Sequence, residues 1–274
     1  MGSRHRPGDG PALVGMRSEA GLSTPRGSSE RRHEWAILGV VALGMFMTAL
    51  DASIVNIGLS SIARTFRTPV GGAAEWVIIA YLVAIAATLL PFGYLSDLVG
   101  RKPVWLAGLA TFTVGSMLCG AAPSLALLVL ARAFQGVGGA LILAPGWAII
   151  TDAFPPAGRG RALGVNAVVF AMGTSLGPTL GGLITEHLSW RWIFYLNVPI
   201  GALALLASQA VLARSGPRRR EPFDVAGAGL LAVGFALLTV ALSFSPRARP
   251  RSEAAKASLM IAKLGAKISA PPSP

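Results

Sequence analysis

Long apolar runs separated by short polar segments dominate the pattern of residues along this chain. A helix needs about 20 mostly apolar residues to cross the hydrocarbon core of a bilayer. Runs of that length occupy residues 35–58, 75–95, 103–122, 125–148, 162–184, 192–213 and 225–244. The pattern therefore predicts an all-α membrane protein with seven transmembrane helices, the last of which is separated from the others by a basic segment.

The segments outside these runs are polar and set the expected domain boundaries. Residues 1–34 are rich in Gly, Ser, Pro and Arg, which is typical of a disordered tail. Arg31 and Arg32 precede an apolar run that is longer than the core of a signal peptide, so we interpret that run as a signal-anchor helix. Residues 214–224 form a basic cytoplasmic loop, and residues 245–274 a polar basic tail that we expect to be disordered or non-native.

The composition agrees with a membrane protein and changes how the charge is interpreted. Of the 274 residues, 53% are hydrophobic and 13% are charged, and the mean hydropathy is +0.61. A formal net charge of +12 would suggest a nucleic-acid partner if the protein were soluble. In a membrane protein, Lys and Arg instead gather in the cytoplasmic loops.

The basic residues around the first six spans lie mainly on one side of the membrane. Fourteen Lys and Arg residues precede the first span or follow the second, fourth and sixth spans, against three on the other side. The N-terminus is therefore predicted to be cytoplasmic, in the inner (plasma) membrane, and nucleic-acid binding is disfavoured. The tail after residue 244 departs from this rule, because its six basic residues fall on the predicted outer side.

Residues that would support an enzyme or a metal site are scarce. Cys119 is the only cysteine, so neither an internal disulfide nor a cysteine metal site is expected. His5, His33 and His187 lie far apart and lack the spacing of metal ligands. The sequence also lacks the G-x-x-x-x-G-K-[ST] phosphate loop and any recognisable catalytic triad. We therefore predict no enzymatic activity, no metal and no cofactor.

One acid and one base lie inside predicted spans, where ionisable side chains are costly and mark candidate functional sites. Asp51 is in the first span, and Arg132 is in the fourth, which runs the opposite way. A rise of about 1.5 Å per residue places both at a similar depth, toward the outer side. The pair predicts a proton or cation site. The alternatives are a static salt bridge between helices and an Asp51 that stays hydrated near the interface.

The fifth span carries a row of glycines. Gly173, Gly177 and Gly181 recur every four residues on one helical face, with Gly182 and Pro178 beside them. Small residues at this spacing let a neighbouring backbone approach closely, and a proline removes one backbone donor and bends the helix. Close packing alone is the usual meaning of this spacing. The combination with Gly182 and Pro178 favours a bent, tightly packed helix that can rock against a partner.

Opposite charges lie between the second and third spans. Gly93 and Gly100 are expected to allow a tight cytoplasmic turn there. Asp97, Arg101 and Lys102 would then lie at adjoining helix ends. These charges either form a latch that holds one conformation or serve only as topogenic charge at a turn.

Five short segments carry a more specific signal. They are, in chain order, LDASIVNIGL from Leu50, GYLSDLVGRK from Gly93, ARAFQGVGGA from Ala131, GTSLGPTLGG from Gly173 and WRWIFYLNVPIG from Trp190. In this order and at this spacing they resemble motifs of the major facilitator superfamily, and within it the fourteen-helix drug:proton antiporters. The key positions of the helix-four motif are Arg132, Gln135, Gly136 and Gly138. Ser53 and Leu98 depart from the family patterns, which have threonine and a basic residue there.

The resemblance implies that residues 35–213 are the six-helix N-terminal half of a transporter whose two halves alternate access. It implies that Asp51 and Arg132 act in proton coupling, with the proton gradient as the energy source. It further implies that residues 93–102 contribute a cytoplasmic gate and that residues 173–182, the antiporter motif, contribute motion of the fifth helix.

The resemblance also implies partners. The transporter would lie in the lipid bilayer and export a small amphipathic drug or metabolite, as in drug resistance. Residues 225–244 would be the first of two linker helices, and the C-terminal half would be missing. We therefore expect a truncated N-terminal fragment of an efflux antiporter. The alternative is a non-transporting truncated membrane protein, or a half-transporter that needs a partner chain.

Overall fold

The computed structural model of the protein describes residues 28–70 and 72–213, together with residues 2, 227, 230 and 234. Within this part of the chain the structure is helical and has no strand, which confirms the predicted all-α class. The elements in chain order are α1 (Ser28–Thr65), η1 (Ala73–Glu75), α2 (Trp76–Val99), α3 (Arg101–Ala121), α4 (Leu125–Ala153), α5 (Pro156–His187), α6 (Arg191–Tyr195) and α7 (Asn197–Val211).

Six helical stretches in the described part are long and apolar enough to cross a bilayer. The helices α1 to α5 account for five of them, and α6 with α7 makes the sixth. They fall on the six spans expected within residues 35–213. The expected seventh helix (225–244), basic loop (214–224) and final tail (245–274) lie outside the continuously described residues, as does most of the expected N-terminal tail.

The first helix begins earlier than the apolar pattern indicates. α1 starts at Ser28, so residues 28–34 are helical and the expectation of a disordered tail up to residue 34 is wrong for them. This stretch contains neither glycine nor proline, and Glu30 in the first turn interacts favourably with the positive end of the helix dipole. A hydropathy pattern detects only the apolar part of a helix, so the polar turns that continue it are missed.

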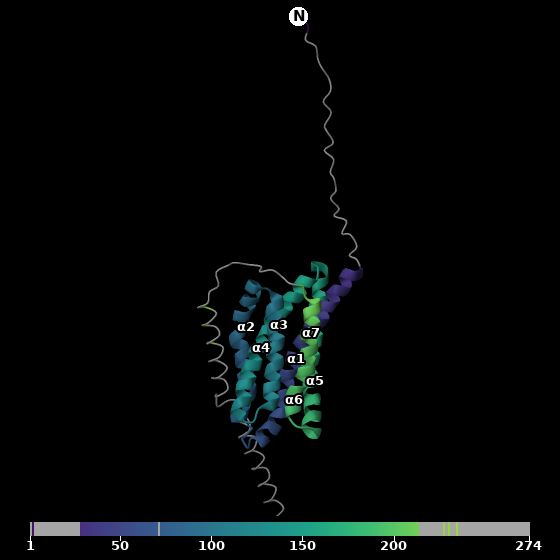
Figure 1. Ribbon diagram of the computed structural model, residues 1–274. Coiled ribbons are helices and arrows are strands. Elements are labelled where there is room, and N and C mark those ends of the chain that lie inside the picture. Colours follow the sequence, from purple (N-terminus) through teal and green to yellow (C-terminus); the bar gives the residue numbers. More distant parts are fainter. Residues whose placement is uncertain are drawn as a thin grey trace, which may run out of the picture.

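The helices form one bundle in which α4, α1 and α7 connect the rest (Figure 1). α4 packs along both α2 and α3, while α1 packs along α5. α7 contacts α1 and α3 and so joins these two groups. The start of α1 projects beyond the end of the bundle at which α7 finishes (Figure 1).

Two apolar clusters fill the interior at different depths. One contains Met45 and Trp105 and lies toward the end at which α1 begins. The other contains Ile54 and Phe194 and lies toward the opposite end. Asp51 falls between them on α1, so the acid occupies the boundary between two well-packed apolar layers.

Glycines allow α4 to approach its neighbours on two sides. A Cβ atom on Gly136 would lie 2.5 Å from the carbonyl oxygen of Tyr81 in α2, and one on Gly138 would lie 2.5 Å from the backbone nitrogen of Phe112 in α3. Neither gap can hold a methyl group without moving a backbone. These two glycines of the helix-four motif therefore set the distances between α4 and the helices around it.

The helices differ in how much of their apolar surface the bundle covers. In the most apolar 18-residue stretch of α1, 67% of the residues are buried. The corresponding share is 11% for the span formed by η1 and α2, and 17% for α5. Exposed apolar residues such as Leu90 on α2 and Leu183 on α5 must be covered by lipid or by another part of a protein. α1 is thus an interior helix, whereas α2 and α5 present broad apolar faces.

Candidate functional site

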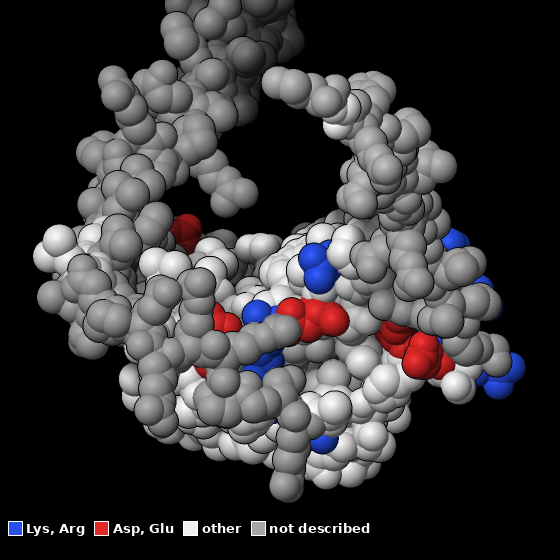
Figure 2. All heavy atoms as spheres, turned by 90° about the horizontal axis from the view of Figure 1, so that it is seen from above, with Lys and Arg blue, Asp and Glu red and all other residues white. Residues whose placement is uncertain are grey.

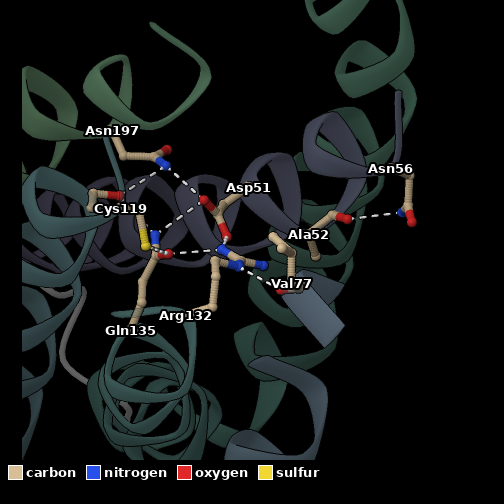
Figure 3. Close-up of polar contacts among 9 residues, drawn as sticks. Asp51, Ala52, Asn56, Val77, Cys119, Arg132, Gln135 and Asn197 are labelled. Carbon is tan, nitrogen blue, oxygen red and sulfur yellow. Dashed lines mark hydrogen bonds and ion pairs between the residues drawn. The ribbon is translucent and has the colours of Figure 1, made fainter. Parts of the chain in front are cut away.

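Asp51 lies at the centre of a buried polar cluster, formed by Asp51, Ser116, Cys119, Arg132, Gln135 and Asn197 (Figure 3). Its Oδ2 accepts a hydrogen bond from Arg132 Nη1 at 2.6 Å. Its Oδ1 accepts from Gln135 Nε2 at 3.0 Å and from Asn197 Nδ2 at 2.8 Å. Donors from α4 and α7 thus converge on one carboxylate of α1, as a fully buried anion requires.

Arg132 is as deeply buried as the acid that it pairs with, at 1% exposure. Besides Asp51, its guanidinium donates to Gln135 Oε1 at 2.7 Å and to the carbonyl oxygen of Val77 at 3.0 Å. Its central carbon lies 4.0 Å from the centre of the Tyr81 ring, a distance typical of a cation–π contact. α2 therefore contributes a carbonyl and an aromatic face to the site.

Gln135 connects the ion pair to α3. Its Nε2 donates to Ser116 Oγ at 2.7 Å, and Asn197 Nδ2 donates to the same hydroxyl at 3.1 Å. The thiol of Cys119 donates to Gln135 Oε1 at 3.4 Å. Side chains from α1, α3, α4 and α7 are thereby held in one hydrogen-bonded network.

The structure brings Asp51 and Arg132 together, as their matched depth predicts, and adds partners that the sequence pattern did not single out. Ser116, Asn197 and Tyr81 were missed, although Asn197 is a polar residue within an apolar run and could have been flagged for that reason. The alternative of an Asp51 that stays hydrated near the interface is wrong, because its side chain is fully buried.

Replacing Asn197 with leucine is expected to destabilise the bundle by about 1–3 kcal/mol, because Asp51 and Ser116 then each lose a hydrogen-bond donor in a buried site. Asn56 offers the matched control. It lies exposed on α1 and donates only to Ala52 O of its own helix at 2.9 Å (Figure 3). Thermal unfolding in detergent should show a clear loss for Asn197→Leu and little change for Asn56→Leu; equal effects would contradict a specific role for Asn197.

A second charged cluster lies where α2, α3 and α4 meet, at the end of the bundle at which α1 begins. Gly100 turns the chain there with a φ of 98°, which favours glycine. Arg101 donates to Asp152 and, at 2.7 Å, to the carbonyl oxygen of Ala148, both in α4. Its Nη2 also lies 3.6 Å from Asp97 Oδ1, near the end of α2. Arg101 thus ties the α2–α3 turn to the end of α4.

Two details of this turn differ from the sequence interpretation. Gly93 does not lie in the turn, because α2 continues to Val99, and Gly100 alone makes the change of direction. Asp152, some fifty residues away in sequence, was not foreseen as the main partner of Arg101. Lys102 does not join these acids. It donates to the carbonyl oxygens of Gln209 and Leu212 at the end of α7.

The glycine row of α5 faces α1. Cβ atoms on Gly173 and Gly181 would lie 2.8 Å from Phe46 O and 3.0 Å from Ile54 O, respectively. A Cβ on Gly177 would contact the hydroxyl of Ser53 and lie 2.9 Å from Ile54 N. The glycine row therefore allows α5 to pack closely against α1.

The two neighbours of this row behave differently from it. Gly182 points away from α1, since a Cβ there would have nothing within 4 Å. Pro178 is exposed inside α5, which continues through it from Pro156 to His187.

The family model of the Major Facilitator Superfamily matches residues 41–262. The chain belongs to the major facilitator superfamily. It is a multi-pass membrane protein whose matched region contains both charged clusters and the α1–α5 glycine contact.

Curated relatives are similar over most of this superfamily chain. It is 35% identical to the riboflavin transporter RibZ of Clostridioides difficile (strain 630), with 77% of this chain and 46% of that protein covered. It is 40% identical to multidrug resistance protein 3 of Bacillus subtilis (strain 168), with coverages of 76% and 40%. The chain therefore spans less than half the length of these relatives.

Solved structures share the fold at low sequence identity. The human organic anion transporter MFSD10 (TETRAN) aligns with a TM-score of 0.55 and 22% identity, over 75% of this chain and 55% of that one. A peptide transporter, POT, in complex with sulfate aligns with a TM-score of 0.59 and 16% identity, over 77% and 46%. Such identities support the superfamily fold alone.

Ser53, where the antiporters have threonine, links two motifs of this superfamily member. Its hydroxyl donates to the carbonyl oxygen of Thr174 at 2.6 Å, so the helix-one motif is hydrogen-bonded to the helix-five motif. Leu98, the other departure, carries no charge. The ion pairs of the α2–α3 turn are formed by Arg101 with Asp97 and Asp152.

Proposed function

We propose that this chain is the N-terminal part of a proton-coupled secondary transporter that exports small amphipathic compounds by alternating access. The observation that carries the proposal is the fully buried pair of Asp51 and Arg132. Two charges in an apolar interior cost several kcal/mol each to desolvate, and a packed apolar pair would stabilise the bundle as well or better. A pair kept at that cost is best explained by a change of its charge during function.

Protonation of Asp51 would act on three helices at once. The neutral acid attracts Arg132 less strongly and is a poorer acceptor for Gln135 and Asn197. The contacts that hold α1 to α4 and α7 would then weaken together, whereas deprotonation would restore them. In this proposal the bundle would have two arrangements whose balance a proton sets, and the proton gradient would drive the cycle without a cofactor.

Two other parts of the structure fit a moving transporter. Arg101 forms ion pairs with Asp152 and Asp97 at one end of the bundle. These pairs would break and re-form if the helix ends separated, which is the action of a gate. The smooth glycine row of α5 lets that helix slide along α1 without side chains blocking the movement. We assign the gate to the cytoplasmic side of the plasma membrane, because more of the described basic residues lie at this end.

The proposed substrate class rests on the names of the relatives. Relatives bear names that specify multidrug resistance or riboflavin transport, so an amphipathic organic compound is the proposed cargo. Substrate sites of such folds lie between two halves near the midplane. This chain would supply one wall, and the exposed apolar faces of α2 and α5 would help to border the second half.

A half-transporter that needs a partner chain is the second candidate function. It is favoured by the exposed apolar faces of α2 and α5, which lipid or another part of a protein must cover. In this reading the chain alone is a non-transporting membrane protein. It gains activity only when another polypeptide supplies the C-terminal half.

Everted vesicles test both candidates. The chain is expressed alone, and also joined to the part of the Bacillus subtilis multidrug resistance protein 3 beyond the matched region, with that part alone as the control. We expect vesicles with the joined protein to take up ethidium when a proton gradient, acid inside, is imposed. We also expect protons to leave the vesicle lumen when ethidium is added. Folded joined protein without either activity would contradict proton-coupled export. Activity of the chain alone would contradict the need for a partner.

A further inference from the structure

An apolar groove runs between α1 and α5 near the end at which α1 begins. Its volume is about 310 Å³, at the lower limit of small-molecule sites. The lining residues are Trp35, Leu38, Gly39, Ala42, Leu43, Phe46, Val165 and Val169. The cavity is lined without a charged side chain and borders two membrane-spanning helices, so it suits an apolar occupant.

Arginines stand at one end of both walls. Residues four apart lie on the same face of a helix, so Arg31 is one turn beyond Trp35 on α1, and Arg161 is one turn beyond Val165 on α5. The two rows meet, because the Arg161 guanidinium carbon lies 5.4 Å from the centre of the Trp35 ring. Stacking on a ring engages the face of a guanidinium and leaves its N–H groups at the edge available.

Trp35 indicates the depth of this end in the membrane. Tryptophan is enriched at the level of the lipid headgroups, and arginines near helix ends extend toward the same level. Trp35 is 39% exposed and also packs edge-on against Phe154. The groove then extends from the headgroup level into the hydrocarbon, with its basic end at the phosphates.

The charge at this end is positive overall. Six described basic residues lie at this end against four acids. The basic residues are Arg31, Arg32, Arg101, Lys102, Arg159 and Arg161, and the acids are Glu30, Glu34, Asp97 and Asp152. Figure 2 looks onto this end of the bundle and shows both blue and red side chains there. Basic residues at the membrane surface attract anionic lipids, by about 1 kcal/mol for each residue.

We propose that this groove binds an anionic phospholipid, with one acyl chain along the apolar walls and its phosphate held by Arg161 and Arg31. Wall chemistry, arginine placement and depth all match such a lipid at once. A substrate or a helix of another protein part would use the apolar walls but neither of the two arginines beyond them. The proposal concerns binding only and is independent of transport, gating and orientation.

Two substitutions separate the contributions of the walls and of the charge. Gly39→Leu fills the groove, and a Cβ there has nothing within 4 Å, so the fold is expected to tolerate it. Gly164→Leu is its matched control, because Gly164 on α5 is equally open but does not line the groove. Arg161→Gln removes the charge, and Arg64→Gln removes an exposed charge from the last turn of α1, away from the groove.

Native mass spectrometry of the purified chain measures binding of phosphatidylglycerol, of phosphatidylcholine with the same acyl chains, and of glycerol phosphate. We expect phosphatidylglycerol to bind about tenfold more tightly than phosphatidylcholine, as one charge-assisted contact provides. Arg161→Gln should remove that preference, Gly39→Leu should weaken both lipids, and both controls should match the wild type. Glycerol phosphate, which lacks the chains, should not bind measurably.

Three results would overturn the proposal. The first is equal binding of the two lipids, and the second is unchanged phosphatidylglycerol binding by Gly39→Leu. The third is displacement of the lipid by ethidium with the same sensitivity to Gly39→Leu, which would make the groove a substrate subsite. Should Arg161→Gln fail to fold, as judged by thermal unfolding, Arg31→Gln tests the same charge.

Discussion

Replacing Asp51 with asparagine is expected to reduce proton-driven export by the joined transporter to the level of vesicles without it. Asparagine cannot take up or release a proton, so the cycle loses the step that couples it to the gradient. Exchange of substrate between two sides without a gradient needs no net proton movement and should persist. Ethidium uptake with and without an imposed gradient, in the same vesicles, measures the two activities separately.

The same substitution also affects stability, which calls for controls. Asparagine leaves Arg132 buried without an anion, a change that costs about 3–5 kcal/mol. The double variant Asp51→Asn, Arg132→Met removes both charges and is expected to recover much of that loss without recovering coupling. Glu75→Gln alters an exposed acid of η1 and should change neither property. Normal proton-driven export by folded Asp51→Asn protein would establish the pair as a static salt bridge.

Replacing Gly177 with valine is expected to lower the stability of the bundle by about 3 kcal/mol, the upper end of the usual cost of overpacking. Its side chain would collide with the hydroxyl of Ser53 and with the backbone of α1 at Ile54, and a backbone cannot move aside as a flexible side chain can. α5 would have to separate from α1 along the whole glycine row. Thermal unfolding in detergent, together with the yield of monodisperse protein, measures the effect.

Gly182 provides the matched control on the same helix. A Cβ there has nothing within 4 Å, so Gly182→Val meets open space while carrying the same β-branched side chain. The two variants share any effect of valine on helix propensity. Equal stability of both would show that packing against α1 is not what requires glycine at position 177.

Much of the fold could be predicted from the sequence, because the length of an apolar run is a local property that the bilayer thickness interprets directly. The six spans within residues 35–213 follow from it, and so does the depth of Asp51 and Arg132. Helix ends could not be predicted as well. Ser28 begins α1 in a polar segment, and Gly93 looks like a turn residue but lies inside α2.

The charged cluster at the α2–α3 turn shows where local sequence patterns stop being informative. Asp97 and Arg101 are neighbours on the sequence, so their pairing could be expected. Asp152 belongs to a different helix, and only the way α4 ends beside the α2–α3 turn brings it to Arg101. A charged residue near a helix end has many possible partners, and the packing of the ends selects one.

The sequence by itself determined the membrane class, the number of spans within residues 35–213, the superfamily motifs and the presence of two charges at one depth. Only the tertiary structure decided what surrounds those charges. Asn197 reaches Asp51 across 146 positions of sequence, and the glycine row of α5 selects α1 as its partner. The physical reason is that periodicity defines the faces of each helix, whereas the rotation and crossing of the helices, set by close packing, decide which faces meet.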